Sequence, residues 1–208
     1  MNSKLSHRLQ TIHDHTPLHA HIYDVGCDHG ELGLSFQIYP QVQTIGLVDP
    51  SSAVIESLIK KTNDSDIPKE VLILRKKANQ LEIKTKKNSV ILCGFGGTQI
   101  AEGLSHLKSQ LDEESVFVLS PHRHVLQLRE WLAKGEFHLL LDTMILEDQQ
   151  FYPLLVLANR KGRGVHPFGE KDLWHSPVGA QYREQLLGVL KKHQNPRDQS
   201  FYRYLESL

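Results

Sequence analysis

Apolar residues occur along the chain in short blocks that glycine, proline or polar residues separate. Blocks rich in Val, Ile and Leu predict buried strands, and segments with apolar residues three or four positions apart predict amphipathic helices. Strands are expected at residues 21–25, 44–49, 71–75, 89–93, 115–120, 138–147 and 151–159. Helices are expected at residues 5–15, 29–38, 51–62, 98–110, 123–134, 178–193 and 198–207.

Strands and helices alternate through most of the chain, which predicts right-handed crossovers and a mainly parallel α/β sheet. The last two strands are separated only by residues 147–150, a hairpin length, so an antiparallel strand is expected at one sheet edge. Seven strands with a terminal hairpin resemble the Rossmann-like sheet of class I methyltransferases. A cofactor would then lie at the carboxyl ends of the first, second and fourth strands.

The chain is expected to divide into a Rossmann-like cofactor-binding domain at residues 1–159 and a basic linker with a short helical region at 160–208. Net charge is zero, so no global basic field indicates nucleic acid. Residues 88–159 nevertheless carry 4 Lys/Arg against 9 Asp/Glu, and residues 160–208 carry 9 against 5. Local phosphate contacts and a solvated helical face explain this basic tail equally well.

Cys27 and Cys93 each end a predicted strand without metal-type spacing, so they are expected to be free thiols in a reducing cytoplasm. The N-terminus carries no apolar core of signal length, and no apolar stretch is long enough to span a membrane. A soluble, cytoplasmic protein is expected. The histidine pairs lack carboxylate or cysteine partners at ligand spacing, so no metal is expected.

The first predicted strand ends in a glycine-broken turn, residues 24–30 (DVGCDHG), and a helix follows it. Gly26 and Gly30 let the backbone pass close to a ligand. About 20 residues later the second strand ends at Asp49, whose carboxylate can accept both hydroxyls of a ribose. If backbone N–H groups of the turn meet the ligand's other end, the pair forms a nucleoside-binding half-site. An ordinary strand-to-helix turn is the simpler alternative.

The turn lacks the G-x-G-x-x-G spacing that favours a pyrophosphate. Asp28 stands where a pyrophosphate would be repelled, whereas the sulfonium cation of S-adenosylmethionine tolerates a carboxylate. A second glycine turn, residues 94–97 (GFGG), follows the fourth strand. It has no Asp/Asn-Pro-Pro-aromatic motif of the kind that accepts protons from a target amine. The missing motif indicates a substrate nitrogen that already has a lone pair.

The sequence resembles the TrmK-type tRNA (adenine-N1)-methyltransferases. The matching segments are residues 5–9 (LSHRL), 24–30 (DVGCDHG), 94–98 (GFGGT), 121–124 (PHRH), 128–132 (LREWL) and 146–152 (LEDQQFY). They cover residues 5 to 158 in order. The resemblance implies transfer of a methyl group from S-adenosylmethionine to N1 of an adenine in the D-arm region of tRNA.

The resemblance also implies roles for individual residues. Asp28 would be catalytic, and Arg8 and Phe95 would meet the RNA. Apart from the resemblance, His122 follows the fifth strand on the same face as the glycine turns and is expected to be a second catalytic residue. Tyr152 is expected to stack on a base, and charge makes Arg123, Lys161 and Arg163 candidate RNA contacts. The implied cofactor-binding residues are Asp24, Gly26, Cys27, Gly30, Asp49, Pro50, Asn79, Gly94, Phe95 and Gly96.

Three departures from the family pattern bear on binding. The segment after the third strand offers only Asn79 where the family has a carboxylate for the adenine amine, a loss on the order of 1 kcal/mol. The second strand ends in Asp49 rather than the usual Glu. The C-terminal region is expected to be shorter than the family's long helical appendage, and whether it forms a dimer stays open.

Several residues keep two interpretations. Asp28 either stabilises the charge that develops on a methylated adenine or caps the helix expected near His29. Phe95 and Tyr152 either stack on a flipped base or belong to the core. Arg123, Lys161 and Arg163 either contact phosphates or are solvated surface charges. Two rival functions also remain: methylation of a small molecule or protein, and a non-catalytic binding module that has lost the cofactor.

Overall fold

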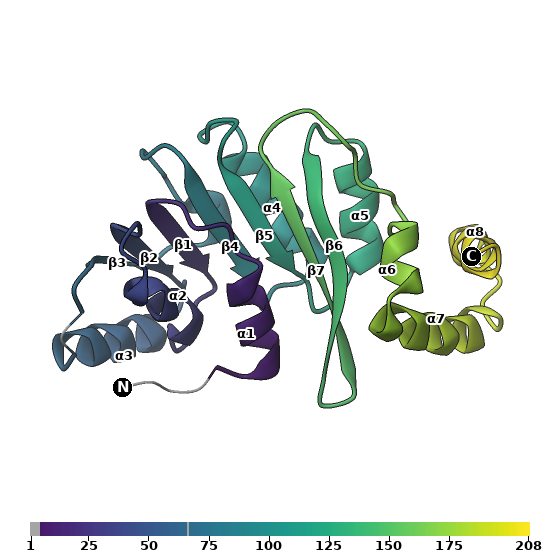
Figure 1. Cartoon of the computed structure of the whole chain (residues 1–208), viewed down its shortest axis with the longest axis horizontal. Helices are drawn as coiled ribbons and strands as arrows, with labels where there is room; N and C mark the ends of the chain where they lie inside the picture. The colour runs from purple at the N-terminus through teal and green to yellow at the C-terminus, as the bar shows by residue number, and fades with distance from the viewer. Residues whose placement is uncertain (1–4, 66) are drawn as a thin grey trace.

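The computed structural model describes residues 5–65 and 67–208 and contains a seven-stranded sheet with the order β3-β2-β1-β4-β5-β7-β6 (Figure 1). All seven strands lie within one residue of their predicted bounds. They are β1 (His21–Val25), β2 (Thr44–Val48), β3 (Glu70–Leu74), β4 (Asn88–Cys93), β5 (Val116–Ser120), β6 (His138–Glu147) and β7 (Gln150–Ala158).

Strands β1 to β5 pair in parallel, and β7 pairs antiparallel with both β5 and β6. The predicted fold class is therefore confirmed. β1 lies between β2 and β4, so the chain leaves β1 toward one side of the sheet and later returns to the other. In such a sheet the crevice for a ligand opens at the carboxyl ends of the strands at this switch point.

The α-helices agree with the sequence except in two places. The expected helix at 29–38 is a short α2 followed by a 3₁₀ turn, because the αL backbone at Gly30 delays the helix start to Glu31. The helix α6 was not predicted. The helical elements are α1 (His7–Asp14), α2 (Glu31–Ser35), η1 (Phe36–Ile38), α3 (Ser52–Asn63), η2 (Ala78–Gln80), α4 (Gly97–Leu107), α5 (Val125–Ala133), α6 (Lys171–His175), α7 (Pro177–Leu190) and α8 (Pro196–Glu206).

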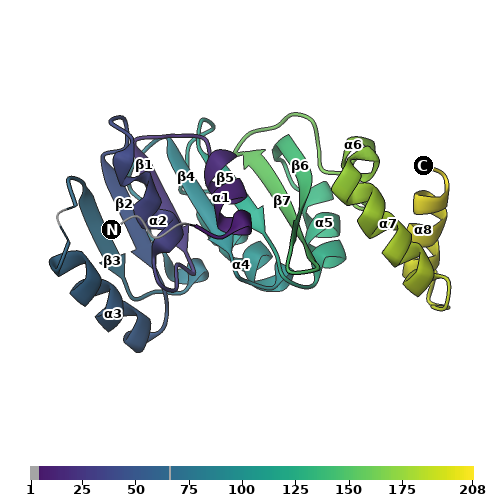
Figure 2. The same cartoon turned by 60° about the horizontal axis from the view of Figure 1, so that its bottom comes forward.

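Helices cover both faces of the sheet, and each face has its own apolar cluster (Figure 2). α4 and α5 pack on one face through side chains such as Ile100 and Leu132. On the other face, α1, α2 and α3 contribute Ile12, Leu32 and Leu58. The alternation of apolar and polar positions read from the sequence is the cause of this three-layer arrangement.

The C-terminal helices α6 to α8 pack against β6 and α5 through a third cluster that includes Met144, Trp174 and Phe201. The segment expected to be a basic linker is held in place by hydrogen bonds to the sheet domain. The Asn159 side chain donates to three carbonyls, including that of Leu111 at 2.8 Å, and Leu139 N–H donates to the carbonyl of Arg163 at 2.7 Å. The division at residue 159 stays a prediction, and residues 1–4 of its first part lie outside the described chain. Among the described residues, no helix has the length and apolarity needed to cross a bilayer.

Candidate functional site

A cavity of about 420 Å³ opens at the carboxyl ends of β1, β2 and β4, beside α1 and α2. It brings together the two glycine turns, both cysteines, the carboxyl group at the end of β2 and the N-terminal helix. Its lining residues are Arg8, Leu9, Asp24, Gly26, Cys27, Asp28, His29, Glu31, Leu32, Asp49, Cys93, Gly94, Phe95 and His122.

The turn after β1 has the backbone conformation that its glycines allow. Gly26 and Gly30 have φ angles of 77° and 67°, and a Cβ at Gly26 would lie 2.5 Å from Cζ of Phe95. The N–H groups of Gly26 and Cys27 donate to the carbonyl of Val48 at 2.7 and 3.2 Å. Because these two N–H groups hold the turn against β2, they are not available to a ligand. The expectation that the turn and the helix start donate N–H groups to a ligand therefore concerns the positions that follow them, and it stays a prediction.

Asp24 and Asp49 place two carboxyl groups on the cavity wall. Asp24 is buried, and its Oδ2 accepts a hydrogen bond from Gly33 N–H at 2.9 Å. Burial, together with the smaller effect of the nearby Asp49 charge, raises the pKa of Asp24 to about 7 despite that hydrogen bond. Asp49 Oδ1 accepts from Ser51 N–H at 2.8 Å, which fixes this carboxylate at the end of β2. A ligand with positive charge and hydroxyl groups suits this wall.

Asp28 lies at the mouth of the cavity in the left-handed region, with φ 47°. Its side chain is 70% exposed, and Oδ2 lies 3.7 Å from Nε2 of His29. α2 begins at Glu31, its N-cap is Gly30, and no side chain caps it. The interpretation of Asp28 as a helix cap is therefore wrong, because the strained turn separates Asp28 from the helix by two residues.

The second glycine turn is pinned to the loop of residues 121–124, which follows β5. His122 N–H donates to the carbonyl of Phe95 at 2.9 Å, and Gly97 N–H donates to that of Arg123 at 2.7 Å. At Gly94 φ is 81°, and an added Cβ would meet no atom within 4 Å. The two loops thus form one rigid edge that carries Phe95 and His122 into the cavity.

Arg8 of α1 joins the N-terminal helix to this edge. Arg8 Nη1 contacts Nε2 of His122, and its guanidinium lies 4.8 Å from the ring centre of Tyr152 on β7. The His122 and Tyr152 rings meet edge to face at 5.4 Å. Burial, reinforced by the charges of Arg8 and Arg123, lowers the pKa of His122, so its imidazole is neutral at pH 7. The sequence assigned Arg8 and Tyr152 to the RNA and His122 to catalysis as separate predictions, and the structure places the three side chains together.

The sequence did not predict a role for Glu147, which anchors this group. Its Oε1 accepts from Arg8 N–H at 2.7 Å and ties the start of α1 to β6. Glu147 lies within one of the segments that carry the family resemblance, and that position is the one signal that could have indicated it. Cys27 and Cys93 are free and buried, and burial raises the pKa of both thiols. Neither is a thiolate nucleophile at neutral pH.

Several predicted site residues lie outside the cavity wall. Pro50 and Asn79 are exposed beyond the ends of β2 and β3, and Gly96 is the N-cap of α4. Their roles stay predictions.

Lys161 and Arg163 follow β7, whose antiparallel direction carries the chain to the opposite edge of the sheet (Figure 1). They pair with Glu136 at 2.5 Å and with Glu170 at 2.7 Å. The structure therefore does not bring them to the site.

Comparison with known proteins gives a consistent result. Residues 5–155 match the family described as "Methyltransferase domain". The tRNA (adenine(22)-N(1))-methyltransferase of Bacillus subtilis is 26% identical over 153 residues, which are 74% of this chain and 64% of that protein. A putative tRNA methyltransferase of Mycoplasma genitalium is 26% identical over 67% of this chain and 62% of its own length. The chain thus spans just under two thirds of these curated relatives.

Solved structures share the fold over nearly the whole chain. M. capricolum TrmK in complex with S-adenosyl-homocysteine superposes with a TM-score of 0.82 at 18% identity, covering 97% of this chain and 98% of that one. Streptococcus pneumoniae Sp1610 with S-adenosyl-L-methionine gives 0.79 at 20% identity and 98% of both chains. Because coverage is almost complete, the shared fold includes the C-terminal helices.

Proposed function

The chain belongs to the methyltransferase-domain family, and on this premise we propose that it transfers a methyl group from S-adenosylmethionine to N1 of an adenine in tRNA. One observation carries the proposal: at the switch point of a methyltransferase sheet, a cavity presents two carboxyl groups beside Phe95 and a neutral His122. The names of the two curated relatives support tRNA as the substrate. A D-arm adenine and a cytoplasmic location are parts of the same proposal.

The residues present fit S-adenosylmethionine. An adenosyl ligand needs a ribose acceptor, and its sulfonium and ammonium groups need nearby negative charge. Asp49 would accept the ribose hydroxyls, and Asp24 would face the cationic end across the Gly26 turn. When bound, the cofactor supplies an activated methyl group. Asn79 would accept from the adenine amine, a role that rests on the resemblance alone.

The target adenine would enter on the side of Phe95, His122 and Tyr152. A base held in a folded tRNA must leave its stack to reach such a cavity, and aromatic side chains receive flipped bases well. Because Arg8 donates to Nε2 of His122, the imidazole carries its proton on Nδ1 in this arrangement. Fixing the base against this group would supply the orientation that lowers a methyl-transfer barrier.

Asp28 is the residue we assign to charge stabilisation. Methylation at N1 places positive charge on the adenine ring and its exocyclic amine. The Asp28 carboxylate would accept a hydrogen bond from that amine as the charge develops. The structure shows that Asp28 does not cap α2, so helix capping does not explain its left-handed backbone conformation. Backbone strain of this kind is typical of functional sites.

Two measurements test the proposal. Calorimetry with S-adenosylmethionine should show binding. Absence of binding would mean that the protein is a non-catalytic member of the family. After unmodified tRNA is incubated with the protein and the cofactor, reverse transcriptase should stop at one adenine of that tRNA, because N1 methylation blocks base pairing. Cofactor binding without such an arrest would indicate a small-molecule or protein substrate instead.

The variant Asp28→Ala should retain cofactor affinity and lose about 100-fold in turnover. Asp64→Ala is the matched control, because Asp64 is also an exposed aspartate but follows α3 outside the cavity. Unchanged turnover in Asp28→Ala would remove Asp28 from the chemistry while leaving the reaction itself in place.

A further inference from the structure

A second cavity, of about 430 Å³, adjoins the first. It lies between the loop of residues 121–124, the β6–β7 hairpin and the C-terminal helices, and His122 lines both cavities. The loop that separates them turns sharply: His124 has φ 57°, and its carbonyl lies where a side chain on Gly97 would have to be. His122 lines both cavities, whereas Arg123 and His124 line only the second.

Aromatic rings form one wall of the second cavity. Phe151 of β7 stacks on Tyr182 of α7 at 4.8 Å, and Trp174 of α6 stacks on Tyr182 at 6.1 Å. Phe168 stacks on Phe201 of α8 at 5.1 Å. Phe151, Phe168 and Tyr182 remain partly exposed, so apolar ring surface lines the cavity. Rings of this kind stack on any nucleobase, because every base has a π face.

The arginine side chains around this cavity differ in whether they are free to bind a phosphate. Arg129 is buried and paired with Asp142, and Arg197 pairs with Glu130 at 2.8 Å. Arg123 is exposed, and within the described chain no ion pair or side-chain hydrogen bond engages its guanidinium. Arg123 is therefore the cation that an incoming phosphate would meet at the entrance.

We propose that the second cavity binds the base of a nucleotide next to the target adenosine, with Arg123 on the linking phosphate. This inference rests on the proposed function, because it assumes that an RNA strand crosses the carboxyl edge of the sheet. The two cavities share His122, so a strand with one base in the first has its neighbour at the second. The aromatic wall then holds the flanking base while the adenine is positioned for transfer.

A direct binding experiment uses tryptophan fluorescence. The chain has two tryptophans, and Trp174 lines the second cavity whereas Trp131 lies against Phe137 elsewhere. In Trp131→Phe, the dinucleotide adenylyl-adenosine should quench Trp174 in a saturable way, and adenosine alone should bind at least tenfold more weakly. Absence of quenching, or equal affinity for the two ligands, would overturn the proposal, as would quenching by an apolar peptide but not by the dinucleotide.

Two further substitutions in this Trp131→Phe background locate the effect. Phe151→Leu removes a stacking face and Arg123→Gln removes the cation, and each should weaken dinucleotide binding about five- to tenfold. Tyr202→Leu and Arg160→Gln are the controls, because Tyr202 packs in the same apolar cluster without lining the cavity and Arg160 lies exposed beyond β7. Thermal melting checks that all four remain folded. Equal affinity in all four variants would overturn the proposal.

The same substitutions in the otherwise native chain, assayed with tRNA, separate this inference from the proposed function. Phe151→Leu and Arg123→Gln should raise the KM for tRNA about tenfold and leave the affinity for S-adenosylmethionine unchanged. A native protein that binds the dinucleotide but does not methylate tRNA would overturn the proposed function and leave the second cavity supported. If the native protein methylates tRNA and both variants have an unchanged KM, the proposed function is supported and the role of the second cavity is overturned.

Discussion

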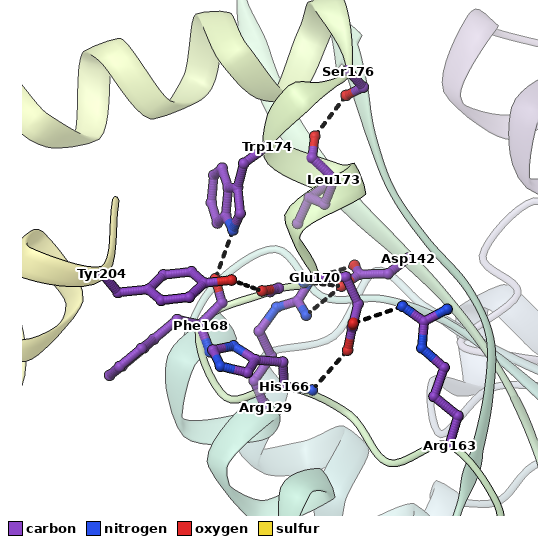
Figure 3. A network of polar contacts seen from close by, with 11 residues as sticks. Arg129, Asp142, Arg163, His166, Phe168, Glu170, Leu173, Trp174, Ser176 and Tyr204 are labelled. Atoms are coloured by element: carbon purple, nitrogen blue, oxygen red, sulfur yellow. Dashed lines mark hydrogen bonds and ion pairs between the residues drawn. The ribbon is translucent and has the colours of Figure 1, made fainter. Parts of the chain in front are cut away.

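Two buried carboxyl groups, one on the central strand β1 and one on the edge strand β6, differ in how far the protein itself satisfies them. Asp24 on β1 accepts a single backbone hydrogen bond and faces a cavity. Asp142 on β6 accepts from Nη1 and Nη2 of Arg129 at 2.9 and 2.5 Å and from Glu170 N–H at 3.1 Å (Figure 3). The Asp24 carboxyl group can accept further hydrogen bonds from a ligand, and we call its surroundings the open end. The Asp142 carboxylate is paired within the protein, and we call its surroundings the closed end.

The network around Asp142 continues into the C-terminal segment (Figure 3). Glu170 accepts from Arg163 and from His166 N–H, Tyr204 donates to the carbonyl of Gly169 at 2.7 Å, and Trp174 donates to that of Phe168 at 2.9 Å. A network in which every member has a partner fixes geometry. It holds α6 to α8 against β6, and so it also shapes the second cavity.

The largest expected effect comes from breaking the buried ion pair at the closed end. Arg129→Met should lower the free energy of unfolding by about 3–5 kcal/mol, because it leaves the Asp142 carboxylate buried without its cation. Urea unfolding followed by circular dichroism measures the change.

The double variant Arg129→Met with Asp142→Leu is the control for charge. Replacing both buried partners by apolar residues is often neutral, so most of the lost stability should return. A single variant as stable as the native protein would show that the ion pair has no structural role at this end.

At the open end, a smaller but more specific effect is expected from Gly26→Ala. The left-handed backbone disfavours alanine by about 1–2 kcal/mol, and the new methyl group would overlap the Phe95 ring. Affinity for S-adenosylmethionine, measured by calorimetry, should fall at least tenfold. Gly188→Ala is the control, because Gly188 lies in α7 with open space around its Cα, and it should stabilise the protein by about 0.4–1 kcal/mol. Equal cofactor affinity in both variants would contradict this account of the turn.

The two ends also differ in how far the sequence could predict them. Strand bounds were accurate throughout, since apolar blocks between glycine and polar turns are local signals. The open end was predictable because its residues, such as Asp24, Gly26 and Asp49, lie in short motifs at the carboxyl ends of consecutive strands. The closed end depends on Arg129, Asp142 and Glu170, which are far apart in the sequence and meet only through tertiary packing. No spacing rule connects them.

The same limit explains the errors within the site. The helix after β1 was expected to begin near His29, because the sequence does not show that Gly26, Asp28 and Gly30 all take the left-handed backbone conformation. Lys161 and Arg163 were assigned to RNA from charge alone. The direction of β7 decides at which edge of the sheet Lys161 and Arg163 lie. The short hairpin predicted this antiparallel direction, but the assignment of the two residues did not take it into account.

A pH dependence should distinguish the two carboxyl groups further. The pKa of Asp24 rises from 3.8 to about 7 in the folded protein. Its contribution to stability is therefore complete below about pH 4 and is lost as the pH rises from there through 7, because the carboxyl group ionises in the unfolded chain while the buried one keeps its proton. Cofactor affinity should run the other way, since a cationic ligand favours the ionised form, and should be about tenfold higher at pH 8 than at pH 6. Asp24→Asn should flatten both profiles, and a native affinity that does not vary with pH would contradict the assignment.

The smallest effect is expected at the edge opposite the cavity. Lys161→Ala and Arg163→Gln should leave the KM for tRNA within twofold of the native value, because both side chains lie beyond the far end of β7 and already pair with carboxylates. Arg8→Gln provides the contrast in the same assay, since Arg8 contacts His122 and Tyr152 at the cavity, and it should raise the KM about tenfold. A large effect from Lys161 or Arg163 would mean that the tRNA wraps around the amino edge of the sheet as well. The open end would then be only part of the RNA surface.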